Sequence, residues 1–359
     1  MRKLFGIIMI LSITVGIAFS AKTVKIARSL YVGWSPWAHM EKSGLAQQWG
    51  NAYGTQFDFD FYQDYLGSVI GVGTGLSEGC TMTNLEAFAS LAAAGVDVTA
   101  VIMGDYSNGN DAVIMRGGYT LETLPASSAV LLVEGSLSQY LFEEGMKSVG
   151  RSPDEFRYIN TTDRDIENAF RGNEDILCVV TWNPMVMNIC SDVPGARNVY
   201  SSKSHPGEVM DMLVVKTDLV RKNPDAIRAL VGMWYDGMKD MQSRTPAGKQ
   251  ARFAMARDQV AEEVPDDEAL LMFENQLQTT MMFYEASQAA AYMQGTQIKA
   301  AMSKVLPWID GKDFGDGPID AGSIGVEFPD GSVIGNNGNV KLRFNSSFTQ
   351  EYANGQLKK

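Results

Sequence analysis

VTAVIMGDYSNGNDAVIMRGG, residues Val98–Gly118, is the stretch that decides the fold. Two apolar runs, Val98–Met103 and Ala112–Met115, flank a polar loop. Both runs are short, contain β-branched residues and are bounded by turn residues, which predicts two buried strands. The loop between them carries Asp105, Tyr106 and Asp111. Its polar residues either face a cleft between two domains, where ligands favour binding, or satisfy the backbone of a surface turn.

The chain outward from this stretch indicates an α/β fold with two domains, as expected for its length. Residues before it form one α/β unit, and after it the predicted strands Val130–Val133, Phe156–Ile159 and Ile176–Val180 alternate with helices. This alternation predicts a parallel sheet. The apolar strand Met212–Val215 then returns the chain to the first unit. We therefore expect residues 22–113 plus 214–359 as domain one and 114–213 as domain two.

The region after the return strand is mostly helical, and the N-terminus has a different character. Helices are expected at Asp225–Met241, Lys249–Val260, Asp266–Gln276 and Glu285–Val305. At the N-terminus, Arg2 and Lys3 precede an apolar run, and Ala18 and Ser20 suit cleavage before Ala21. Residues 1–20 therefore read as a secretory signal peptide, which predicts a soluble, exported, periplasmic chain.

Composition limits the partners and cofactors that the chain can have. Without Arg2 and Lys3 the formal net charge of −12 becomes −14, which argues against nucleic acid and anionic lipid. Of the three cysteines, Cys178 and Cys190 could pair, which would leave Cys80 free and buried. The chain has only two histidines and no CxxC motif, and Asp310–Gly317 lacks the acid spacing of a calcium loop. We expect no metal site and no cofactor.

Two helix starts follow predicted strands, one in each half. Thr83 and Glu86 have the spacing of a capping box, and Ser136 and Gln139 repeat it. The free N–H groups of each helix start would face whatever lies beyond the strand end. Trp34 and Trp37 also follow a strand, so either both form an aromatic wall at the same edge of the sheet, or Trp37 packs in the core and only Trp34 faces out.

A hydrolase is the rival interpretation. Gly75-Leu76-Ser77-Glu78-Gly79 matches the pattern G-x-S-x-G, and His205 could complete a triad with an aspartate. The pattern requires a strand before the serine and a helix after it, but here the predicted order is reversed. We therefore expect no catalytic residues and no enzyme activity.

Several motifs together resemble a known family. They are Tyr31-Val32-Gly33-Trp34, Gly79-Cys80-Thr81-Met82-Thr83-Asn84, Gly104-Asp105-Tyr106-Ser107-Asn108-Gly109-Asn110-Asp111, Thr181-Trp182-Asn183-Pro184 and Pro206-Gly207-Glu208. The chain resembles the periplasmic substrate-binding proteins of ABC importers, in the nitrate, sulfonate and taurine group, and within it the branch encoded beside urea carboxylase. The resemblance implies a two-domain type II binding fold with a two-strand hinge. It also implies a monomer that closes on a small solute and delivers it to an ABC permease and its ATPase.

The residues expected at the cleft favour one class of ligand. They are rich in carboxylate and aromatic side chains, which suit a guanidinium ion better than a sulfonate or nitrate. The branch near urea carboxylase is likewise associated with urea or guanidine. We predict a small nitrogen-rich ligand, with a small anion as the alternative if Arg28 or Arg116 reaches the cleft. The predicted ligand-binding residues are Trp34, Thr83, Asp105, Tyr106, Asp111, Ser136, Trp182 and Glu208.

Overall fold

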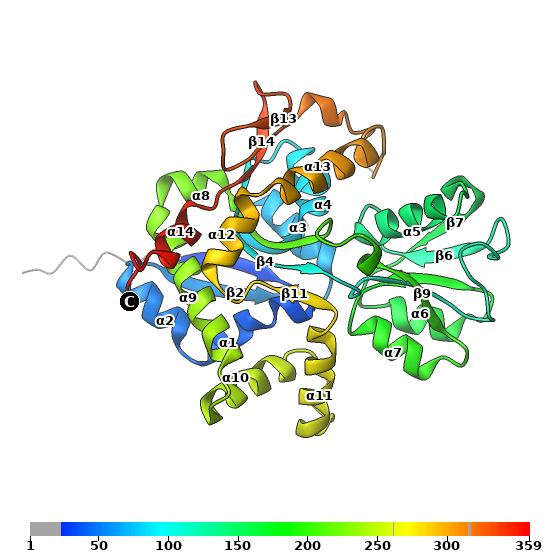
Figure 1. Ribbon diagram of the computed structural model, residues 1–359, viewed down its shortest axis with the longest axis horizontal. Coiled ribbons are helices and arrows are strands. Elements are labelled where there is room, and N and C mark those ends of the chain that lie inside the picture. Colours follow the sequence, from blue (N-terminus) through cyan, green and yellow to red (C-terminus); the bar gives the residue numbers. More distant parts are fainter. Residues whose placement is uncertain (1–22, 261, 315–316) are drawn as a thin grey trace, which may run out of the picture.

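The computed structural model describes residues 23–260, 262–314 and 317–359, so the expected signal peptide lies outside the described residues. Two separate sheets organise this part of the chain, one with nine strands and one with five. Figure 1 shows the smaller sheet with its helices on one side of the molecule and the larger sheet on the other. The α/β two-domain expectation is confirmed at this level.

The larger sheet takes strands from both ends of the chain. Its order is β13 (Val333–Gly335), β12 (Gly325–Glu327), β14 (Val340–Phe344), β4 (Val98–Ser107), β10 (Met210–Lys216), β3 (Gly79–Thr83), β1 (Thr23–Arg28) and β2 (Gln56–Phe61), with β11 (Thr280–Met282) on the far end of β4. Strand β10 is antiparallel to both β3 and β4, which flank it. Strands β3 and β4 therefore end at the same edge of the sheet.

The smaller sheet has the order β7 (Arg157–Asn160), β6 (Ala129–Leu132), β8 (Cys178–Thr181), β5 (Ala112–Met115) and β9 (Arg197–Ser201). Strands β7, β6 and β8 are parallel, as the alternation of strands and helices predicts. Strands β5 and β9, however, pair antiparallel, so the sheet is mixed. The difference arises because β5 enters from the larger sheet and β9 leads back to it.

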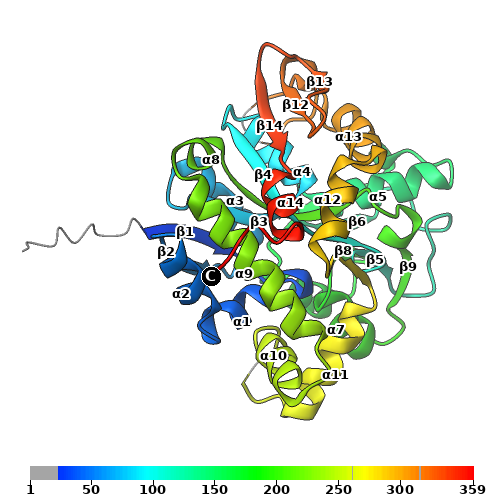
Figure 2. The same cartoon turned by 60° about the vertical axis from the view of Figure 1, so that its left-hand side comes forward.

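Helices surround both sheets. Beside the smaller sheet lie α5 (Leu137–Ser148), α6 (Ile166–Gly172) and α7 (Met185–Asp192). The others are α1 (Pro36–Lys42), α2 (Leu45–Ala52), α3 (Tyr65–Thr74), α4 (Asn84–Glu86), α8 (Thr217–Lys222), α9 (Pro224–Gln242), α10 (Pro246–Arg257), α11 (Asp266–Leu277), α12 (Ala286–Gln294), α13 (Thr296–Ile309) and α14 (Ser347–Ala353). The last of them, α14, packs against α9 and α12 (Figure 2). Within the described residues, no helix combines the length and apolarity needed to cross a membrane.

The core explains why the apolar runs form strands and helices where they do. One apolar cluster covers the larger sheet and continues onto one face of the smaller sheet through Ile114, Leu131 and Val179. The other face of the smaller sheet packs under α5 through a second cluster. Within the larger cluster Trp37 is almost fully buried, and its ring lies 4.9 Å from that of Trp234. Cys80, Cys178 and Cys190 are all free thiols, so the open pairing of the last two does not occur here.

The decisive stretch forms two strands, but the first is longer than expected. Strand β4 continues through Asp105 and Tyr106 to Ser107, where the apolar pattern predicted a loop. Pairing explains the extension, because β10 and β11 hydrogen-bond to this polar end of β4. The chain therefore leaves the larger sheet after Ser107 and enters the smaller one at Ala112. It leaves the smaller sheet at Ser201 and re-enters the larger one at Met210.

Candidate functional site

Neighbouring strand ends of the larger sheet bring three polar residues together. Asp211, near the start of β10, pairs across the sheet with Thr83 at the end of β3 and with Asp105 near the end of β4. Tyr31 and Trp34 follow the end of β1. The carboxyl ends of strands in α/β sheets line the crevices where ligands bind, which makes this edge the candidate site.

The smaller sheet closes this edge from the opposite side. Ser136 caps helix α5, which follows β6, Trp182 follows β8, and Asp111 precedes β5. The residues around the cavity are Tyr31, Trp34, Tyr65, Thr83, Glu86, Asp111, Ser136, Leu137, Trp182 and Asp211. About 310 Å³ is free of protein atoms, and the centre of a water molecule can reach about 20 Å³ of it. In this conformation the cavity suits a ligand of only a few heavy atoms.

Four buried carboxyl groups surround or back the cavity: Glu86, Asp105, Asp111 and Asp211. Hydroxyl groups donate to three of them. The Tyr31 hydroxyl lies 2.8 Å from Asp105 Oδ1, the Ser107 hydroxyl 2.5 Å from Asp111 Oδ2, and the Tyr65 hydroxyl 2.8 Å from Glu86 Oε2. Among the described residues, no lysine, arginine or histidine forms an ion pair with any of the four. Among the described residues, the cavity therefore gathers acidic groups without a basic side chain paired to them.

Burial changes the acidity of these groups. Loss of solvent raises the pKa of Asp105 to about 7, against the lowering effect of the Tyr31 hydroxyl. Burial likewise raises the pKa of Asp111 to about 7, against the Ser107 hydrogen bond. The pKa values of Asp211 and Glu86 are also raised, first by burial. Strongly perturbed carboxyl groups that face one cavity are typical of functional sites.

Glu86 joins the two halves of the molecule. Its Oε1 accepts a hydrogen bond of 2.8 Å from the backbone N–H of Leu137, the first residue of α5. The Thr83 hydroxyl caps the Leu85 N–H and donates to Glu86, while the Thr83 N–H donates to the Tyr65 hydroxyl instead. The helix thus starts at Asn84 as predicted, but the capping-box glutamate does not reach back to the Thr83 N–H as the motif requires. It binds the start of α5 in the other half of the molecule instead.

Aromatic rings form one wall of the cavity. The Trp34 and Tyr65 ring centroids lie 5.4 Å apart, and those of Tyr65 and Trp182 lie 5.7 Å apart. The Trp182 N–H donates to the Leu30 carbonyl at 3.2 Å, which also ties the two halves together. The Trp34 N–H, in contrast, is buried and has no partner among the described residues. A ligand in the cavity would meet aromatic surface beside the carboxyl groups.

The structure brings five of the eight predicted residues to the cavity: Trp34, Thr83, Asp111, Ser136 and Trp182. Asp105 does not line the cavity but lies directly behind Tyr31, which does. The Tyr31 hydroxyl donates a hydrogen bond to Asp105. Tyr106 does not lie at the cavity. Successive residues of a strand point to opposite faces, so Tyr106 stacks on Tyr292, with ring centroids 5.8 Å apart.

Glu208 also lies away from the cavity. Its carboxylate accepts a hydrogen bond of 2.9 Å from the Tyr140 hydroxyl, pairs with Lys304, and lies 3.1 Å from His205 Nδ1. Burial works to raise its pKa, but the bonds from His205, Lys304 and Tyr140 lower it to about 2. Glu208 is therefore an ionised partner in a surface-side ion-pair network and not part of the cavity wall.

Arg28 and Arg116, the two arginines that could have bound an anion in the cleft, make other contacts. Arg28 makes a two-bond ion pair with Asp258, at 2.6 and 3.1 Å. The Arg116 guanidinium lies 3.8 Å from the ring centroid of Phe170 and donates to the Phe170 carbonyl. Neither side chain lines the cavity.

Sequence reasoning missed the cavity residues Tyr31, Tyr65, Glu86, Leu137 and Asp211. Glu86 was assigned to a capping box with Thr83, and this local role gave no reason to expect it at a cavity. Asp211 could have been noticed, because it is a single acid within the apolar run from Val209 to Val215. An acid is rarely buried unless it has a specific role. In the structure Asp211 lies opposite Asp105 at the cavity.

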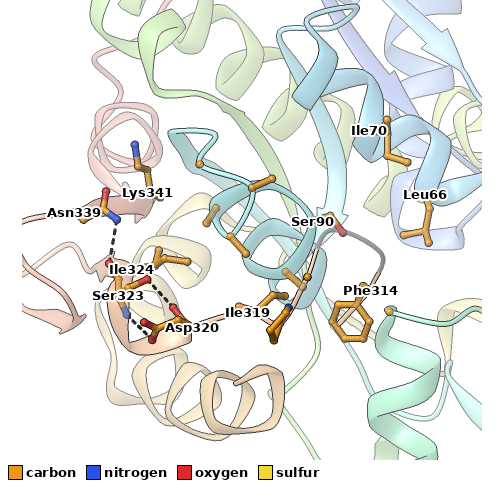
Figure 3. A pocket seen from close by; sticks show the side chains of 18 of the residues that line it. Leu66, Ile70, Ser90, Phe314, Ile319, Asp320, Ser323, Ile324, Asn339 and Lys341 are labelled. Carbon is orange, nitrogen blue, oxygen red and sulfur yellow. Dashed lines mark hydrogen bonds between the residues drawn. The ribbon is translucent and has the colours of Figure 1, made fainter. Parts of the chain in front are cut away.

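A larger hollow lies elsewhere and has different walls (Figure 3). The centre of a water molecule can reach about 380 Å³ of it, against about 20 Å³ in the smaller cavity, and apolar side chains such as Leu66, Ile70 and Phe314 line much of it. Its polar groups serve local structure: Asp320 accepts from the Ser323 N–H, and the Asn339 side chain donates to the Ser323 carbonyl. Volume alone would favour this hollow, but the buried polar groups gather at the smaller cavity.

Similarity to known proteins is visible in structure and not in sequence. No family model matches the chain, and no curated protein matches it. Among solved structures, the periplasmic aliphatic sulphonate binding protein SsuA from Escherichia coli is similar with a TM-score of 0.58 and 14% identity, over 80% of this chain and 94% of that one. This is the periplasmic binding protein fold. The type II binding fold expected from the sequence motifs is thus supported by shape.

Other solved structures are similar to the chain over comparable or greater lengths. The periplasmic nitrate-binding protein NrtA from Synechocystis is similar over 95% of this chain and 99% of that one, with a TM-score of 0.57 and 12% identity. The ligand-binding component of an ABC-type import system from Staphylococcus aureus, solved with zinc bound, has a TM-score of 0.59 and 15% identity over 79% and 92% of the two chains. At these identities the likeness establishes the fold alone.

Proposed function

We propose that this protein is a periplasmic solute-binding protein that captures a small nitrogen-rich cation, guanidinium first, and delivers it to an ABC permease and its ATPase. The single observation that carries the ligand assignment is the cavity chemistry. Carboxyl groups of Glu86, Asp111 and Asp211 line a small cavity, and no described lysine, arginine or histidine pairs with them. The binding-protein fold supports the transport role.

The physical argument concerns charge. A cation that leaves water for a buried site needs a compensating charge, because an unpaired ion loses several kcal/mol of solvation. Carboxylates supply that charge and accept the in-plane N–H bonds of a guanidinium group, while its face stacks on aromatic rings for about 1–2 kcal/mol. Trp34, Tyr65 and Trp182 offer such rings beside Asp111 and Asp211. The same carboxylates would repel a sulfonate or a nitrate ion.

Capture involves both halves of the molecule. We assign residues 22–113 plus 214–359 to one domain and 114–213 to the other, with the ligand between them. Several contacts cross this division in addition to those at the cavity: Glu143 on α5 accepts from the Trp308 N–H at 2.8 Å and pairs with Lys312 at 2.9 Å. Such contacts would hold the closed form once a ligand has neutralised the carboxyl groups.

Urea is the second candidate, and one observation favours it. The buried Trp34 N–H has no partner, and a urea carbonyl could accept a hydrogen bond from it, which guanidinium cannot. Urea would also fit a cavity of this size. Against urea, a neutral ligand offers no positive charge to pair with Asp111 and Asp211, which line the cavity without a basic partner among the described residues.

The ligand assignment is tested by thermal unfolding of the processed protein with guanidinium, urea, taurine and nitrate, each at millimolar concentration. A ligand present at ~100 times its Kd stabilises the folded state by ~2.7 kcal/mol. We expect guanidinium chloride to raise the Tm by several degrees. Potassium chloride at the same ionic strength is the control. A shift with taurine or nitrate and none with guanidinium would contradict the proposal.

Replacing Trp34 with phenylalanine separates the two nitrogen-rich candidates. Phenylalanine keeps an aromatic ring but removes the N–H, so a urea complex should weaken by about threefold to tenfold, the value of one hydrogen bond of ~0.5–1.5 kcal/mol. Guanidinium affinity should change by less than about threefold, because the ring remains. Calorimetric titration of both ligands measures the two effects. An unchanged urea affinity would contradict the hydrogen bond from Trp34 on which the urea candidate rests.

The hydrolase alternative finds no support in the described residues. Ser77 follows helix α3 and precedes strand β3, which is the reverse of the order that an exposed nucleophile needs. Its side chain is buried, and the His205 ring instead contacts the Tyr200 hydroxyl at 2.5 Å and Glu208 at 3.1 Å. A serine–histidine pair is therefore not assembled at this motif.

A further inference from the structure

Asp211 occupies the centre of the acidic group at the cavity. It lies on β10 between Thr83 of β3 and Asp105 of β4, and it lines the cavity that Asp105 backs. Asp211 and Asp105 are direct cross-strand partners, and the Tyr31 hydroxyl donates to Asp105. Asp211 is 3% exposed and Asp105 is fully buried. Two adjacent carboxyl groups thus share one dry environment.

The protein supplies too few donors for both groups to be ionised. The Tyr31 hydroxyl has one proton, which it donates to Asp105 Oδ1 at 2.8 Å. Asp105 Oδ2 is buried and has no partner when the aspartates are ionised. Two neighbouring carboxyl groups that cannot both ionise share one proton, as in other carboxyl pairs. A protonated Asp211 provides the donor that the pair lacks.

We propose that Asp211 carries a proton in the empty protein, shared with Asp105, and releases it to solvent when a cation enters the cavity. The proposal rests on the proposed function, since it requires a cationic ligand. One positive charge enters as one leaves, so the net charge of the buried site stays the same. The pair would thereby select for charge: a cation can replace the proton, whereas a neutral solute cannot.

Burial and the neighbouring carboxyl groups favour the protonated form of Asp211, and the Tyr31 hydroxyl acts in the opposite direction. Asp105 on β4 and Asp111 before β5 act on it by charge repulsion, and both are themselves buried. Tyr31 lies beside the pair, Tyr65 on α3 lies near enough to interact with Asp211, and Glu86 on α4 acts on Asp111. The first cause of the raised pKa of Asp211 is burial, followed by the charges of Asp105 and Asp111. No described basic side chain pairs with Asp211 to oppose them.

Exchange of one proton for one cation has a measurable linkage. Guanidinium affinity should rise by up to tenfold per pH unit while the pair remains protonated, and should level off once the empty site has ionised. Urea binding should lack this rise, because a neutral ligand does not displace the proton. The slope therefore distinguishes the proposed exchange from a general effect of pH on closure.

Calorimetric titration with guanidinium chloride at pH 7, in phosphate and in Tris buffer, counts the protons released from the difference in buffer ionisation heat. We expect about one proton per ligand. Asp211→Asn should lower the count by about one, whereas Asp58→Asn, whose side chain is about half exposed on β2, should leave it unchanged. Binding of guanidinium with a proton count near zero would overturn the exchange and leave the proposed ligand intact.

Infrared spectroscopy of the ligand-free protein tests the proton directly and does not depend on whether a variant folds. The C=O stretch of protonated carboxyl groups should be present at pH 7 in the wild type, and guanidinium should reduce it by the contribution of one carboxyl group. Absence of this band in the empty protein would overturn the proposal. A band that persists, with no guanidinium binding at any pH, would overturn the exchange together with the proposed ligand.

Discussion

Replacing Asp111 with asparagine is expected to weaken guanidinium binding by about thirtyfold or more. Asp111 lines the cavity, is 4% exposed, and uses one carboxylate oxygen to accept from the Ser107 hydroxyl. Removing one partner of a buried, hydrogen-bonded charge pair costs ~2–5 kcal/mol of binding free energy, and each 1.4 kcal/mol is about tenfold in Kd. Asparagine preserves the shape of the side chain, so the change removes charge with little change in volume.

The matched control is Asp58→Asn, which removes one negative charge from an exposed position of β2 in the same sheet. We expect its guanidinium affinity to stay within about twofold of the wild type, because exposed charges are screened. Calorimetric titration of the three proteins gives the comparison. Unchanged guanidinium binding in Asp111→Asn, or a gain of taurine or nitrate binding without loss of guanidinium, would refute the cationic site.

The same substitution is expected to stabilise the empty protein above pH 7. Burial raises the pKa of Asp111 to about 7 in the folded protein, whereas an unfolded aspartate titrates near ~3.9. Below about pH 4 the group is protonated in both states and contributes no difference. As the pH rises from about 4 to 7 the unfolded state loses its proton first, so the wild type loses stability relative to the variant, by up to ~4 kcal/mol.

Thermal unfolding of ligand-free wild type and Asp111→Asn at pH 4 to 8 measures this difference. The gap in Tm should be small at pH 4, widen in favour of the variant as the pH rises, and reach a plateau above about pH 7. Chemical denaturation is unsuitable, since urea and guanidinium are the two candidate ligands. A gap that is independent of pH, or that favours the wild type at high pH, would show that Asp111 is ionised at no cost in the folded protein.

Asp111→Asn is thus expected to weaken guanidinium binding and to stabilise the empty protein. The combination of these two effects identifies a binding residue. A carboxylate kept for structure would destabilise the protein when it is removed, as expected for Glu86, whose bonds join Thr83, Tyr65 and the start of α5. A buried carboxylate that binds a ligand lowers the stability of the folded protein while the ligand is absent, as in the usual conflict between stability and function. The cavity contains both kinds, and the variants separate them.

Much of the fold followed from local sequence patterns. The apolar run at Ala112–Met115 forms a strand with the predicted bounds, because it combines β-branched residues with flanking turn residues. Thr83 and Ser136 start helices, because a hydroxyl side chain satisfies the first free N–H groups of a helix wherever it occurs. These are properties of a few neighbouring residues, so the order of the chain was enough to find them.

Strand register, in contrast, comes from partners that are distant in the chain. Strand β4 reaches Ser107 because β10 and β11 pair with its polar end, and that end has no apolar pattern of its own. The same pairing puts Asp105 toward the cavity and Tyr106 toward Tyr292, a choice that alternates with every residue and is reversed by a shift of one. The sequence indicated that both residues lie near the crossing between the sheets, but it could not say which of them faces the cavity.

The sequence by itself determined the fold class, the two-sheet organisation and the enrichment of acids and aromatics where the chain crosses between the sheets. The tertiary structure alone decided which of these side chains meet. It placed Glu86 and Asp211 at the cavity, whereas Glu208 forms an ion pair with Lys304 and accepts a hydrogen bond from Tyr140. It also decided how readily each carboxyl group ionises. The physical reason is that charge and burial are set by the neighbours of a residue in space, which lie far away along the chain.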